Sequence, residues 1–284
     1  MRPPGDEGIG RSGTAAVSGG RAGPWVLAAT ILGSSMVFID GTVVNIALPA
    51  ILADFRATVV DAQWVVEAYA LFLAALLLTG GSLGDRFGRR RVFTIGVGLF
   101  SLASVGCGLA ADVRQLIAAR AIQGVGGALL VPGSLAILSA SFPENERGRA
   151  IGTWSGFTAI TGALGPVMGG WLVDHLSWRW AFFVNVPMAA AVLALTAWHV
   201  PESRDEAASR KLDWPGALLA STGLGGVVYA LIESSHRGWR DTRVLGALAL
   251  GVLSLLSFGL VERRSSAPML PPRLFRSRNF TGSN

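Results

Sequence analysis

The stretch Gly80-Gly-Ser-Leu-Gly-Asp-Arg-Phe-Gly-Arg-Arg-Arg-Val-Phe93 is a short basic loop that separates two long apolar runs. Arginines that directly adjoin membrane-length apolar segments mark the cytoplasmic side of a membrane protein. The loop therefore predicts the direction in which each flanking segment crosses the bilayer.

A weaker copy of this loop begins at Gly169, 89 positions after Gly80. The residues that match are Gly169, Gly170, Leu172, Asp174, Arg179 and Phe182. If each repeat holds three membrane helices, an odd number, the second copy crosses the bilayer with opposite polarity, which is typical of secondary transporters. The sequence thus predicts an all-α integral membrane protein whose first six helices form an inverted 3+3 repeat.

The composition also indicates a membrane protein. The chain has 284 residues, of which 51% are hydrophobic and 15% charged, and its mean hydropathy of +0.50 lies above the usual range of soluble domains. The net charge is +6, but the basic residues lie in short loops between apolar runs, so they indicate orientation rather than nucleic-acid binding. Cys107 is the sole cysteine and the histidines are scattered, so we expect no intramolecular disulfide, no metal site and no cofactor.

Apolar runs that reach the length of about 20 residues needed to cross a bilayer recur eight times. They are approximately Trp25–Leu48, Ala62–Leu83, Val92–Ala111, Gln115–Ala140, Arg149–Leu172, Trp180–Val200, Trp214–Ile232 and Val244–Val261. An even number of spans places both termini in the cytoplasm, although the basic cluster Arg237–Arg243 opposes the placement of the last two spans.

The expected organisation has five parts. They are a disordered cytoplasmic tail (1–23), a six-helix first half (24–200), a cytoplasmic loop (201–212), two additional membrane helices (213–262), and a basic cytoplasmic loop with the truncated start of a next helix (263–284).

Four stretches resemble motifs of the major facilitator superfamily. Gly81-Ser-Leu-Gly-Asp-Arg-Phe-Gly-Arg-Arg90 resembles the signature loop between helices two and three, and the others are Asp40-Gly-Thr-Val-Val-Asn-Ile-Ala-Leu-Pro49, Arg120-Ala-Ile-Gln-Gly124 and Gly162-Ala-Leu-Gly-Pro-Val-Met-Gly-Gly170. The last is similar to the motif that marks antiporters. Together with Trp178-Arg-Trp180, Asn185-Val-Pro187 and the extra helix pair, these stretches resemble the amino-terminal part of the fourteen-helix drug/proton antiporter branch.

The signature loop is a candidate conformational latch. Asp85 lies among arginines near a helix end, where a charge-assisted contact to a neighbouring helix would form in one conformation and break in another. The residues of this candidate latch are Gly81, Asp85, Arg86, Gly88, Arg89 and Arg90. The alternative is that the arginines only anchor the topology.

Three ionisable side chains are predicted inside the membrane at one level. A rise of about 1.5 Å per residue places Asp40, Glu67 and Arg120 each about 8 Å from the outer edge of the hydrocarbon. Such residues are costly there and usually functional. The resemblance implies that the helix-one acid and the helix-four arginine take part in proton coupling, and that an acid in helix two occurs in some multidrug members. The alternatives are a static ion pair, or a Glu67 that extends to the interface.

Two further groups of residues are candidates for function. Gly165-Pro166 is expected to break regular helix hydrogen bonding, and the motif residues Gly162, Gly165, Pro166, Gly169 and Gly170 leave little side-chain bulk between helices. Residue chemistry alone favours tight packing there, and only the resemblance implies antiport. Candidates to line the substrate path are Asn45, Gln123, Trp64, Tyr69 and Trp154, although aromatic residues at these depths usually serve packing.

These features predict a secondary active transporter of the cell membrane, not an enzyme, that exports drugs or other amphipathic or cationic small molecules in exchange for protons. Its expected partners are substrate, protons, the lipid bilayer and a missing carboxy-terminal half, with no nucleic acid. An ATP-driven pump would need a phosphate loop with Gly before its Lys, whereas Lys211 follows Arg210. A facilitator or symporter for another small solute and a non-transporting truncated product remain as alternatives.

Overall fold

The computed structural model describes residues 22–204 and 213–264, and every regular element in these two ranges is a helix. The helices are α1 (Gly23–Phe55), α2 (Val59–Phe87), α3 (Arg89–Gly108), α4 (Val113–Ser141), α5 (Glu144–His175), α6 (Trp180–Phe183), α7 (Asn185–His199), α8 (Trp214–Arg237) and α9 (Thr242–Arg264). Within these described ranges, eight segments are long and apolar enough to span a membrane, with α6 and α7 together forming one of them. The predicted all-α membrane fold with eight spans is therefore confirmed. The expected tail at 1–21, the loop residues 205–212 and the basic segment 265–284 lie outside the described residues.

The helices extend several residues beyond the apolar runs because polar residues cap them. At the start of α2, the Thr58 hydroxyl accepts from the Asp61 N–H and the Asp61 carboxylate accepts from the Thr58 N–H. Asp112 caps α4 and Asp213 caps α8 in the same way, through one side-chain oxygen each. Such caps satisfy the N–H groups that a helix start leaves without an intrahelical partner.

The expected break at Gly165-Pro166 does not divide α5. The helix continues from Glu144 to His175 with Pro166 inside it. Proline has no backbone N–H, so one hydrogen bond of the helix is lost at Pro166. The adjacent turns keep their backbone hydrogen bonds, and the helix continues. The expected helix Trp180–Val200 is instead divided at Val184 into α6 and α7.

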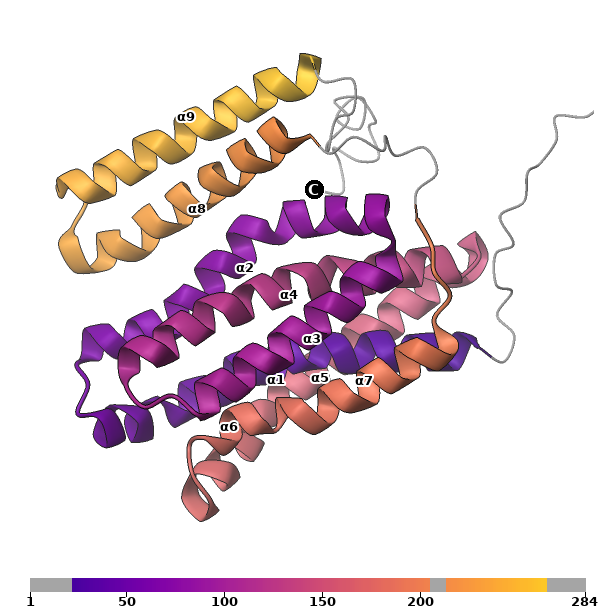
Figure 1. The fold of residues 1–284 in the computed structure, drawn as a ribbon, viewed down its shortest axis with the longest axis horizontal. Coiled ribbons are helices and arrows are strands. Elements are labelled where there is room, and N and C mark those ends of the chain that lie inside the picture. Colours follow the sequence, from indigo (N-terminus) through magenta and orange to yellow (C-terminus); the bar gives the residue numbers. More distant parts are fainter. Residues whose placement is uncertain (1–21, 205–212, 265–284) are drawn as a thin grey trace, which may run out of the picture.

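The six-span bundle is built around α1 and α4. α2 and α3 pack on α4, α5 and α7 pack on α1, and the pair α8–α9 lies along the edge of the bundle, with α8 against α2 (Figure 1). Large apolar side chains on the outside remain exposed, for example Leu102, Val167 and Trp198. This pattern fits a bundle that is surrounded by hydrocarbon rather than by water.

The two copies of the sequence repeat lie at opposite ends of the bundle. Gly88 joins α2 to α3 at one end, which we call the Gly88 end. The turn between α5 and α6 lies at the other end, the Arg56 end, where Trp178 Nε1 donates to Asp54 Oδ2 over 3.0 Å and Arg179 pairs with the same carboxylate at 3.4 Å. This arrangement is the one that an inverted repeat requires.

Candidate functional site

A fully buried ion pair joins α1 to α4 inside the bundle. Asp40 is 0% exposed and Arg120 is 1% exposed, and Arg120 Nη1 lies 2.5 Å from Asp40 Oδ2. Arg120 Nε donates to the carbonyl oxygen of Val65 on α2 over 3.0 Å, and the guanidinium carbon lies 4.2 Å from the ring centre of Tyr69. Three helices thus fix the orientation of the guanidinium.

The second carboxylate oxygen of Asp40 is held by two amides. Gln123 Nε2 donates to Oδ1 over 2.8 Å, and Asn185 Nδ2 donates to the same atom over 3.0 Å. Asn185 also donates to Ser104 Oγ over 2.9 Å. Asp40, Ser104, Arg120, Gln123 and Asn185, the buried polar cluster, therefore join α1, α3, α4 and α7. A charge in such a place is tolerated because it is paired and hydrogen-bonded.

The sequence located part of this cluster. Asp40 and Arg120, expected at one level, are in direct contact, while Gln123, expected to line the substrate path, is a fully buried member of the cluster. Ser104 and Asn185 were not predicted as site residues. Ser104 is a single neutral polar residue within an apolar span and gives a weak signal, whereas Asn185 belongs to the stretch Asn185-Val-Pro187, which was used for the family resemblance but not as a site.

Glu67 lies outside the cluster and faces the additional helix pair. Its Oε1 lies 3.7 Å from Nε2 of His236 on α8, and its Oε2 is buried without a hydrogen-bond partner among the described residues. Counting residues along a helix predicts depth but not the direction in which a side chain points. The three charges expected at one level therefore separate into the Asp40–Arg120 pair and a Glu67 that contacts α8.

At the Gly88 end, Asp85 contacts the next helix. Its Oδ1 accepts from Arg89 Nε over 2.9 Å and from Arg89 Nη2 over 2.7 Å, so the pair spans the turn between α2 and α3. Arg90 Nη2 donates to the carbonyl oxygen of Ala197 on α7 over 3.0 Å. The expected loop is therefore helical except for Gly88, and its side chains join α2 to α3 and α3 to α7.

Glu202, which was not predicted, caps the start of α3. Its carboxylate accepts from the N–H groups of Arg90 and Arg91 over 3.1 and 3.2 Å, where a negative charge is favourable to a helix. Gly88 has a φ of +110°, and a Cβ there would overlap the Glu202 carboxylate at 2.6 Å. Glycine is therefore required at 88 both for the backbone conformation and for the close approach of Glu202.

Only part of the motif on α5 contacts another helix. A Cβ at Gly165 would collide with Thr42 Oγ1 on α1, and a Cβ at Gly169 would lie 3.2 Å from Val43 Cα. Gly162 and Gly170 have no such neighbour within 4 Å among the described residues. Glycine at 165 thus leaves room for the Thr42 side chain, and glycine at 169 lets the backbone of α1 approach α5.

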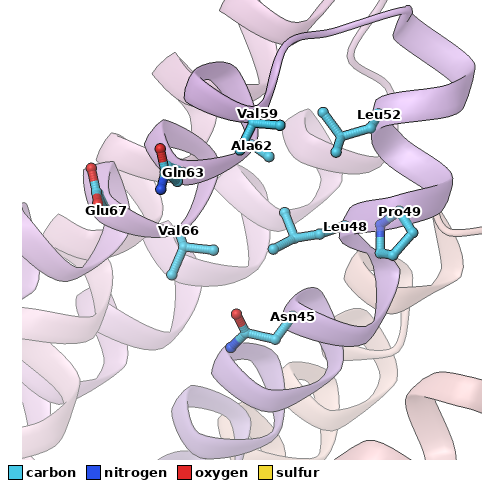
Figure 2. A pocket seen from close by; sticks show the side chains of 9 residues that line it. All are labelled: Asn45, Leu48, Pro49, Leu52, Val59, Ala62, Gln63, Val66 and Glu67. Carbon is cyan, nitrogen blue, oxygen red and sulfur yellow. The ribbon is translucent and has the colours of Figure 1, made fainter. Parts of the chain in front are cut away.

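The other substrate-path candidates occupy different places. Asn45 lines a cavity of about 450 Å³ between α1 and α2, together with Glu67 (Figure 2). Trp64 lies beside Tyr229 of α8 with ring centres 6.1 Å apart, and Trp154 Nε1 donates to Ser34 Oγ over 3.1 Å. Tyr69 is buried beneath Arg120. Asn45 is therefore the candidate that lines the α1–α2 cavity.

Comparisons with known proteins identify relatives of about twice this length. The sequence profile of the Major Facilitator Superfamily matches residues 30–271. The chain is 41% identical over 261 residues to the tetracenomycin C resistance and export protein of Streptomyces glaucescens, covering 92% of this chain and 48% of that protein. It is 43% identical over 260 residues to the puromycin resistance protein of Streptomyces alboniger, covering 91% and 51%. The chain thus spans about half the length of the curated relatives it matches.

Solved structures agree in fold. A crystal structure of a peptide transporter in complex with sulfate superposes with a TM-score of 0.56 at 15% identity, covering 84% of this chain and 53% of that one. A bacterial homologue of the human lysosomal transporter Spinster gives a TM-score of 0.55 at 23% identity, covering 89% and 63%. At these identities the likeness concerns the fold alone.

Proposed function

Because this chain belongs to the Major Facilitator Superfamily, we propose that it supplies the amino-terminal half of a proton-driven exporter of drugs or other amphipathic or cationic small molecules. The names of its relatives support this substrate class, since two of them confer resistance to tetracenomycin C and to puromycin. The observation that carries the proton coupling is the buried Asp40–Arg120 pair.

The pair can couple a proton to a helix movement. Arg120 and the amides of Gln123 and Asn185 together bind both carboxylate oxygens of Asp40. A proton can take the place of Arg120 only when the two side chains separate, which requires α1 to move relative to α4. Protonation and conformation are then linked, as an exporter driven by a proton gradient requires.

The proposed transport cycle needs a second half. In this fold two six-helix halves move around a site between them, and the chain spans about half of its relatives. We place the Gly88 end and both termini on the cytoplasmic side of the cell membrane, because the arginines of the signature loop gather there. Asp85, Arg89 and Glu202 would then form a contact at the cytoplasmic surface that opens and closes with the cycle.

The test of coupling is Asp40→Asn in the complete transporter. Uphill drug efflux driven by an imposed pH gradient should fall to background, while drug binding persists, because asparagine keeps the shape and polarity of the side chain but cannot carry the proton. Asp40→Glu, which retains an exchangeable proton, should keep part of the activity. Efflux by Asp40→Asn at the normal rate would rule out Asp40 as the proton carrier. Measured proton counterflow separates this exporter from a facilitator or symporter.

The chain by itself should not transport. Purified chain in proteoliposomes with a pH gradient should accumulate no more dye than empty liposomes. Accumulation that disappears in Asp40→Asn would instead identify the chain, as a homo-oligomer, as a transporter in its own right.

A further inference from the structure

The cavity between α1 and α2 has the size and lining of a site for a small apolar molecule. Its volume of about 450 Å³ lies within the range of about 300–1,000 Å³ that is common for ligand sites. The lining is mainly aliphatic and consists of Leu48, Pro49, Leu52, Val59, Ala62 and Val66 with the polar residues Asn45, Gln63 and Glu67. Figure 2 shows Leu48 of α1 and Val66 of α2 on facing walls, with Glu67 at the edge.

The one charged side chain of this lining has an unsatisfied oxygen. Glu67 Oε2 is buried and has no hydrogen-bond partner among the described residues, while Oε1 is 3.7 Å from His236 Nε2, which is longer than a hydrogen bond. The nearby acid Glu233 is paired with Arg237, its neighbour on the same helix. A buried carboxylate oxygen without a partner is costly, and a positive ligand would relieve that cost.

We propose that the α1–α2 cavity binds a hydrophobic organic cation, with Glu67 as the counter-charge and His236 as an internal competitor for the same carboxylate. The proposal deepens the proposed function, on which it rests for the substrate class. The aliphatic walls favour a cation whose charge is surrounded by apolar groups, because they cannot replace the water shell of a small inorganic ion. Within the described residues no cluster of three or more His, Cys, Asp or Glu side chains could hold a metal ion.

His236 can be changed without undocking α8. Thr79 of α2 and Ser221 of α8 share a hydrogen bond of 3.0 Å, and the rings of Trp64 and Tyr229 also meet across this interface. Neither contact involves His236, so both should remain when it is replaced. His236→Gln is therefore the variant that removes the competitor while the cavity walls stay in place.

The experiment measures equilibrium binding of radiolabelled tetraphenylphosphonium to the purified full chain in lipid nanodiscs. Glu67→Gln should weaken binding about tenfold, the loss expected for one charge-assisted contact. Leu48→Trp should abolish binding by filling the cavity without changing any charge. His236→Gln should bind as tightly as the wild type or more tightly. Asp174→Asn, which removes an exposed acid on α5, is the charge-matched control and should bind normally.

Folding of each variant is checked by the protection of the buried thiol of Cys107. Equal affinity of wild type and Glu67→Gln, or no saturable binding by the wild type, would overturn the proposal. Weaker binding by His236→Gln would also overturn the proposal, because it would show that the Glu67–His236 contact stabilises the site rather than competing with the cation. If binding were independent of Glu67 while efflux by the complete transporter depended on Asp40, this site would fail and the proposed function would stand. If binding followed Glu67 but no proton-driven efflux occurred, the proposed function would fail instead.

Discussion

Removing the Asp40 carboxylate should destabilise the isolated chain strongly. Asp40→Asn leaves the guanidinium of Arg120, which is 1% exposed, inside the bundle without its counter-charge. Breaking a buried pair by removing one partner costs about 3–5 kcal/mol in the free energy of unfolding. The loss should be at least about 3 kcal/mol, because an asparagine whose oxygen accepts from Gln123 and Asn185 turns its NH2 group, a donor, toward the donor Nη1 of Arg120.

The chain contains a built-in reporter for this measurement. Cys107 is the sole cysteine and is fully buried, so a thiol-reactive fluorescent dye labels it only after the bundle opens. At about 2–4 °C per kcal/mol, a loss of about 3 kcal/mol lowers the melting temperature by about 6–12 °C. Tryptophan fluorescence provides a second reading of the same transition.

Two controls separate charge from packing. Asp40→Asn combined with Arg120→Gln removes both charges and should restore at least half of the lost stability, because no uncompensated charge remains. Asp85→Asn breaks an ion pair whose carboxylate is 42% exposed, so it should cost less than about 1 kcal/mol. If Asp40→Asn melted within about 2 °C of the wild type, or if the double variant were less stable than the single one, the argument from a buried charge pair would be refuted.

Two further predictions concern the Gly88 end. Glu202→Gln removes the negative charge at the start of α3. Amide hydrogen exchange at Arg90 and Arg91 should become about fivefold faster, which corresponds to a loss of about 1 kcal/mol. Unchanged exchange would show that Glu202 does not cap α3 in solution. Single cysteines at Asp85 and Arg56 in a Cys107→Ala background should react with a membrane-impermeant thiol reagent from opposite faces of the membrane, and equal reaction from outside would contradict the proposed orientation.

The order of the membrane helices could be predicted from the sequence, because it depends on local chemistry, whereas their bounds differ from the prediction by several residues. Comparing the length of each apolar run with the thickness of a bilayer identified the eight spans found among the described residues. The rise per residue placed Asp40 and Arg120 at one level, and the structure brings them into contact. Polar caps such as Thr58 and Asp112 explain why the helices extend beyond the apolar runs.

The partners that side chains find far along the sequence were decided by the tertiary structure alone. Asn185 donates to Asp40 from 145 positions away, and Glu202 caps a helix that begins more than a hundred positions before it. Glu67, expected at the level of Asp40 and Arg120, faces His236 of α8 instead of that pair. The length of a helix fixes how deep a residue lies, whereas its rotation about its own axis and its choice of neighbour follow from the packing of all the helices together. The sequence therefore specified which charges enter the membrane, and the assembled bundle determined which of them meet.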